Sequence, residues 1–174
     1  KKTYRSRYSL TELYPTVMLE KSAIFCSLPT NYLDSINEFD TLLFEELINL
    51  QKKCFSDLDA KIFYSEEAYL LCKDIENTTE ISKANTSEIS KIFEENPEID
   101  HLILFSNLTP FFNSKLFNEL VEIHTQYAAE LTHGENIPPG IVPAIVHRSA
   151  IEVLEELVDL TQLDEQKISL MILF

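Results

Sequence analysis

The chain has 174 residues, a formal net charge of −15, 45% hydrophobic residues and 2 glycines. These values fit one globular domain with a sizeable core and exclude a disordered chain. The acidic balance argues against nucleic-acid binding by the folded body, and no apolar run approaches the roughly 18 residues of a membrane span.

The beginning and end of the sequence differ from its middle. Residues 1–20 have no clear periodicity and are predicted to form an N-terminal arm, ahead of a single domain over residues 21–174. Basic residues at the start fit either a solvated tail or an interaction arm. The sequence lacks an initiator methionine and ends in an apolar run at 168–174, so we expect a fragment of a longer chain. A buried last strand is the alternative.

Cysteine usage indicates the compartment. Cys26, Cys54 and Cys72 are odd in number, widely spaced and set in apolar runs. This pattern is typical of buried free thiols in a reducing environment, which predicts a cytoplasmic protein.

Short apolar runs predict buried strands, in chain order, at residues 23–27, 60–64 and 101–105. Further extended segments are expected at 130–133 and 141–146. Strands of this kind between amphipathic helices predict an α/β fold with a three-layer architecture: a mostly parallel sheet, with helices on both faces.

Helices are predicted between these strands from capping residues and apolar spacing. Asp40, Asn85 and Asn113 are suited to N-cap positions, and Ser149 with Glu152 forms a capping-box pattern. A short helix is expected at residues 66–72. The polar stretch at 74–86 is expected to be a loop.

Ligands of open α/β sheets bind beyond the carboxyl ends of the strands, which brings together the loops at 27–31, 106–113 and 133–140. The candidate ligand-binding residues are the polar groups of the last two loops: Asn107, Thr109, His133, Glu135 and Asn136. His133 and Glu135 are the pair to test for acid/base or metal chemistry. A rigid surface turn at residues 134–140 is the alternative.

The other histidines, His101, His124 and His147, are expected to be structural.

Residues 99–154 carry a recognisable order of motifs. An apolar HLILF strand is followed by a Pro-Phe-Phe-Asn turn at 110–113, a helix ending in His-Thr-Gln-Tyr at 124–127, and a Pro-Pro-Gly loop at 138–140. This order resembles the sugar nucleotidyltransferases of the cytidylyltransferase type, which have the GT-A fold. It is still more similar to the nucleotidyltransferase-like N-terminal region of spirochaetal radical-SAM proteins with a SPASM extension. The resemblance implies a C-terminal radical-SAM domain or another protein partner.

The residues that make this family active are missing here. The loop at 27–31 has neither the glycine nor the basic residue that grips nucleotide phosphates, and Asn107 and Thr109 occupy the turn where the family has a metal-binding Asp. Val142 and Ala144 align with the family's later acids. Because nucleotidyl transfer needs metal and basic groups to neutralise phosphate charge, the resemblance implies a non-catalytic accessory or binding domain with no cofactor and no metal. The alternatives are an active sugar cytidylyltransferase using Mg²⁺ and a nucleotide, and a structural or assembly domain.

Overall fold

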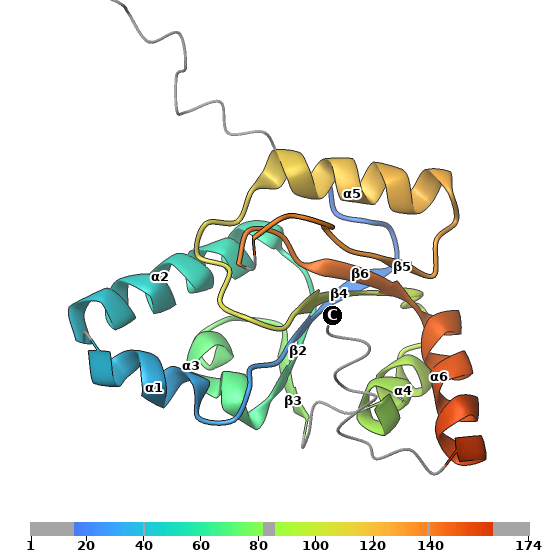
Figure 1. The fold of residues 1–174 in the computed structure, drawn as a ribbon, viewed down its shortest axis with the longest axis horizontal. Coiled ribbons are helices and arrows are strands. Elements are labelled where there is room, and N and C mark those ends of the chain that lie inside the picture. Colours follow the sequence, from blue (N-terminus) through green and yellow to red (C-terminus); the bar gives the residue numbers. More distant parts are fainter. Residues whose placement is uncertain (1–15, 40, 82–85, 139, 162–174) are drawn as a thin grey trace, which may run out of the picture.

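The computed structural model describes residues 16–39, 41–81, 86–138 and 140–161. A six-stranded mixed sheet in the order β3-β2-β1-β4-β6-β5 forms its centre (Figure 1). Strands β3, β2, β1 and β4 are parallel, whereas β6 runs antiparallel to both of its neighbours. The strands are β1 (Ser22–Cys26), β2 (Ile62–Ser65), β3 (Thr78–Ile81), β4 (His101–Phe105), β5 (Leu131–Thr132) and β6 (Ala144–His147).

Helices cover both faces of this sheet, as the sequence predicts. They are α1 (Tyr32–Phe39), α2 (Thr41–Leu58), α3 (Tyr69–Cys72), α4 (Thr86–Glu95), α5 (Ser114–Gln126) and α6 (Arg148–Thr161), with a 3₁₀ turn at Glu66–Ala68. Apolar residues of α2 and α5 belong to the core on one face, and those of α4 and α6 to the core on the other. The three-layer α/β architecture is therefore confirmed.

The two central strands show why each face has its own core. Along β1, Ile24 and Cys26 pack with α2 and α5, whereas Ala23 and Phe25 pack with α4 and α6. Strand β4 alternates in the same way. Successive side chains of a strand point to opposite faces, so a fully apolar strand supplies both cores at once.

Two local predictions are wrong, and one helix was not predicted. The expected polar loop at 74–86 contains β3, which pairs with β2 at the exposed edge of the sheet. Residues 27–31 form a loop as expected, and the helix that was not predicted is α1, which lies between this loop and position 40. Ser149 is not an N-cap, because α6 already begins at Arg148 and the backbone N–H of Ser149 donates to Nδ1 of His147 at 3.2 Å.

Of the remaining predictions, one helix cap is confirmed and several others concern residues that the structure does not describe. Asn113 caps α5, with its side-chain oxygen accepting from the Leu116 N–H at 3.0 Å. The caps expected at Asp40 and Asn85, residues 1–15 of the N-terminal arm and the apolar end at 168–174 lie outside the described residues. Among the described helices, none has the length and apolar character needed to cross a membrane.

Candidate functional site

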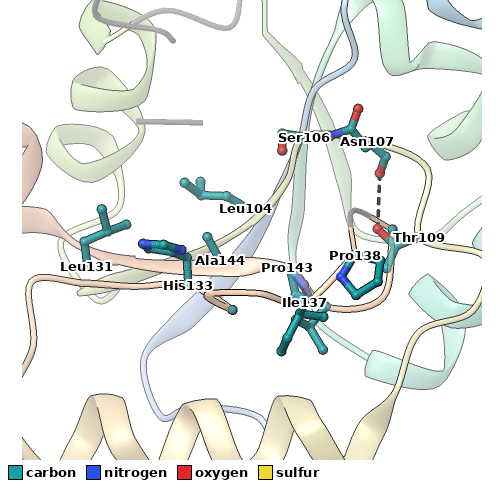
Figure 2. A pocket seen from close by; sticks show the side chains of 13 residues that line it. Leu104, Ser106, Asn107, Thr109, Leu131, His133, Ile137, Pro138, Pro143 and Ala144 are labelled. Atoms are coloured by element: carbon teal, nitrogen blue, oxygen red, sulfur yellow. Dashed lines mark hydrogen bonds between the residues drawn. The ribbon is translucent and has the colours of Figure 1, made fainter. Parts of the chain in front are cut away.

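A cavity of about 280 Å³ opens at the carboxyl end of β4 (Figure 2). Ser106, Asn107 and Thr109 line it from the loop that follows β4, and His133, Gly134 and Pro138 from the loop that follows β5. Leu104, Leu131, Ile137 and Val142 are among its apolar lining residues. The two loops therefore share one cavity, at the place where an α/β sheet holds its ligand.

Gly140 fixes the approach of the two loops. Its φ is +84°, and a Cβ added there would lie 2.8 Å from the backbone oxygen of Leu108. Beside this contact, the N–H of Asn113 donates to the carbonyl of Ile141 at 3.0 Å. Only a residue without a side chain allows the backbones to come this close in this conformation.

The buried side-chain amide of Gln51 holds the loop that follows β4. Gln51 of α2 is fully buried, and its side-chain oxygen accepts from the backbone N–H of Thr109 at 2.5 Å. The Thr109 hydroxyl in turn donates to the carbonyl of Asn107 at 3.2 Å, as Figure 2 shows. These bonds give the loop a fixed shape around the cavity.

The five candidate ligand-binding residues separate into two groups. Asn107, Thr109 and His133 line the cavity, with Thr109 buried and His133 exposed at the edge. Glu135 and Asn136 are exposed in the turn after Gly134 and are not lining residues. A role in ligand binding stays a prediction for all five.

The lining chemistry does not fit a magnesium nucleotide. Among the described lining residues, the polar side chains are the hydroxyls of Ser106 and Thr109, the amide of Asn107 and the imidazole of His133. Mg²⁺ in phosphate-transfer sites is held by carboxylates, and the transferred phosphates need Lys or Arg, neither of which lines this cavity in the described part of the chain. Within the same residues, no group of three His, Cys, Asp or Glu side chains is placed to hold a metal ion.

The thiol at the end of β1 is buried and does not line the cavity. Cys26 is buried, and its hydrogen bond with Cys72, together with burial, raises its pKa well above the ordinary value. A thiol attacks as the thiolate, so burial and a raised pKa both disfavour reaction at this cysteine.

Sequence reasoning missed two residues of the site. Ser106 directly follows β4, and the rule that selected Asn107 applies equally to it. Gln51 carries a clearer signal, because it is a polar residue at the helical spacing of the buried Phe55 and Leu58. A polar side chain on a buried helical face needs a buried partner, which here is the Thr109 loop.

Comparison with known proteins supports the fold. No family model matches the chain, and no curated protein matches it. A cytidylyltransferase from Leptospira borgpetersenii serovar Hardjo-bovis (strain JB197) superposes with a TM-score of 0.55 at 13% identity, covering 80% of this chain and 65% of that one. The chain has a cytidylyltransferase-like fold. It spans less than two thirds of the length of this structural neighbour.

A second solved structure has a similar fold. The 4-diphosphocytidyl-2C-methyl-D-erythritol synthase from Anaerococcus prevotii DSM 20548 superposes with a TM-score of 0.50 at 10% identity, covering 86% of this chain and 81% of that one. At these identities the likeness concerns the fold, and function depends on the residues of the site itself. The nucleotidyltransferase-like character expected from the sequence is thus supported at the level of the fold.

Proposed function

We propose that the chain is a non-catalytic, nucleotidyltransferase-like binding domain that takes an uncharged small molecule into the cavity beyond β4. The observation that carries this proposal is the chemistry of the lining. Its described polar groups are hydroxyls, an amide and an imidazole beside apolar side chains, with no carboxylate, Lys or Arg.

The size and polarity of the cavity favour a ligand about as large as a nucleobase or a monosaccharide. Its volume of about 280 Å³ is at the small end of the usual range for ligand pockets. Asn107 supplies both a donor and an acceptor, and Leu104, Ile137 and Pro138 offer apolar contacts for a ring. A phosphate group would lack a cationic partner and would meet a chain of net charge −15.

Binding assays with matched ligands test the proposal. Calorimetric titrations with cytidine, CMP and CTP, with and without Mg²⁺, and with neutral monosaccharides should give binding for an uncharged compound and weaker binding for each added phosphate. Asn107→Leu should abolish the binding, whereas Glu122→Gln, at an exposed position of α5 outside the lining, should leave it unchanged. Tighter binding of CTP with Mg²⁺ than of cytidine would contradict the proposal.

An active sugar cytidylyltransferase using Mg²⁺ is the second candidate, supported by the cytidylyltransferase neighbours. Incubation with Mg²⁺, each NTP and a panel of sugars separates the two. Protein-dependent release of pyrophosphate would establish the enzyme. No release, together with binding of a neutral ligand, would support the binding domain.

We propose further that the domain is cytoplasmic and serves a protein partner, such as a radical-SAM domain in the same chain. The support for this is the motif order at residues 99–154 and the three free cysteines. A Cys-x₃-Cys-x₂-Cys run in the full-length protein would support the radical-SAM attachment. A full-length sequence without such a run would contradict it.

A further inference from the structure

Three of the four histidines meet at the end of the sheet opposite the cavity. His101 begins β4 and is directly paired with His147, which ends β6. The ring centroid of His101 lies 4.9 Å from that of His147 and 5.1 Å from that of His124, in the last turn of α5. The histidine cluster, as we call His101, His124 and His147, thus joins two strands and a helix.

Two buried ring nitrogens of the cluster have no polar partner in the described part of the chain. Nδ1 of His101 and Nε2 of His124 are buried and have no hydrogen-bond partner among the described residues. A cavity of about 350 Å³ beside them is lined by all three histidines and by small or apolar side chains such as Leu19, Ala128 and Ala129. A positive charge here would be poorly solvated and would lie close to two other imidazoles.

The charged groups around the cluster do not offset such a charge. Asp100 precedes His101 and binds Lys21 at 3.1 Å and Arg148 at 3.5 Å. Glu130 lies at the edge of the cavity, where the Ser149 hydroxyl donates to it at 3.3 Å. Burial, followed by the nearby His124 and His147, lowers the pKa of His101 to about 4. The carboxylate of Asp100 and the backbone of Glu20 act in the opposite direction but are weaker.

The same imidazoles hold neighbouring elements in place. Nδ1 of His124 is hydrogen-bonded to the Thr132 hydroxyl at 2.8 Å, and Thr132 is one of only two residues in β5. Nδ1 of His147 accepts from the backbone N–H of Ser149 in the first turn of α6, which requires an unprotonated nitrogen at that position.

We propose that the histidine cluster is an acid-sensitive latch, which holds β5 and the His133 edge of the ligand cavity in place while the His124 imidazole is neutral. Thr132 immediately precedes His133, and Leu131 lines the cavity. When Nδ1 of His124 carries the proton that is donated to Thr132, acid adds an N–H at the buried Nε2, which has no hydrogen-bond partner among the described residues. The ring must then move toward water, which breaks the bond to Thr132. The latch rests on the proposed function in one respect: the segment that it holds forms one edge of the proposed ligand cavity.

The direction of the pH effect follows from linkage. Burial, followed by His147, lowers the pKa of His124, and the pKa of His101 is also below its ordinary value of 6.5. A group whose folded-state pKa is depressed binds fewer protons in the folded than in the opened state. The latch is therefore closed above the ordinary pKa of 6.5 and opens as the pH falls below it, through the lowered pKa of His124.

Amide NMR tests the latch without a ligand. In ¹⁵N-labelled protein, the signals of residues 131–134 should shift or broaden together with one midpoint below pH 6.5, while those of β1 stay constant. His124→Gln should remove this response. His133→Gln, which changes the one histidine outside the cluster, should retain it at residues 131 and 132.

A second variant keeps the test informative if His124→Gln does not fold. Thr132→Val removes the bond to the latch but leaves the cluster intact, so His124 should still titrate while the amides of residues 133 and 134 stay constant. Amides that respond equally in Thr132→Val, or that change only with global unfolding seen by circular dichroism, would overturn the proposal. Because the readout is conformational, its failure leaves the ligand proposal standing, and failed ligand binding leaves the latch standing.

Discussion

Replacing Gly140 by alanine is expected to destabilise the protein through two separate effects. At a φ of +84° an L-residue is strained, at a cost of about 1–2 kcal/mol. The new Cβ would also lie 2.8 Å from the backbone oxygen of Leu108, which cannot rotate away as a side chain can. Moving the loops apart adds strain of similar size, so we expect a total loss of about 2–4 kcal/mol.

Gly134 provides the matched control. A Cβ there would meet the side chain of Ile137, with its Cδ1 at 2.7 Å, and that flexible end can move. Gly134→Ala should therefore cost clearly less than Gly140→Ala. Gly140→Asn separates the two effects, because asparagine tolerates positive φ but keeps the Cβ clash.

Urea unfolding followed by circular dichroism measures these differences, and thermal unfolding gives an independent scale. A loss of 1 kcal/mol corresponds to about 2–4 °C in Tm for a chain of this size, so Gly140→Ala should lower Tm by roughly 5–15 °C. If Gly140→Ala unfolds within about 0.5 kcal/mol of the wild type, or if Gly134→Ala costs more, the reasoning about the loop contact is refuted.

Three further predictions concern the core, a cap and the thiols. Phe117→Ala, at a fully buried position of α5, should lower the free energy of unfolding by about 3–5 kcal/mol in urea titrations, and a loss below 1 kcal/mol would contradict its place in the core. Asn113→Ala should cost about 1 kcal/mol by losing the N-cap of α5, whereas Asn113→Asp should stay close to the wild type; equal losses in both variants would argue against a capping role. Cys26 and Cys54 should react with a thiol reagent far more slowly in the folded protein than in urea. Hydrogen bonding and burial raise the pKa of Cys26, and burial raises the pKa of Cys54 to about 12. Rapid labelling of both thiols in the folded protein would contradict this prediction.

The central part of the fold is predictable from the sequence because its signals are local. Strands β1, β2 and β4 are short apolar runs, and Asn113 stands directly before an amphipathic helix. Strand β3 could not be found in this way. Its sequence, TTEI, is polar because the strand lies at an exposed edge of the sheet, where two of its four residues are exposed. Its strand character comes from pairing with β2, which is a tertiary effect.

The histidine cluster shows the same limit at the level of a site. His101 and His147 are 46 positions apart, and only the antiparallel register of β4 and β6 places them side by side. A shift of that register by one residue would turn one ring to the other face of the sheet. Single-sequence patterns do not fix the register of strands so far apart. The sequence therefore predicts structural histidines but not that they meet.

The scarcity of glycine bears on function as well as on folding. Loops that bind phosphate need glycines where the backbone must approach the ligand closely. Both glycines of this chain are in the loop after β5, and Gly140 allows the approach of that loop to Leu108 rather than to a ligand. The glycine with a positive φ, Gly140, thus lies at a contact between two loops of the protein and not beside a ligand phosphate. A cavity built in this way offers a bound molecule side-chain amides, hydroxyls and apolar surface, which is why we favour an uncharged ligand over a nucleoside triphosphate.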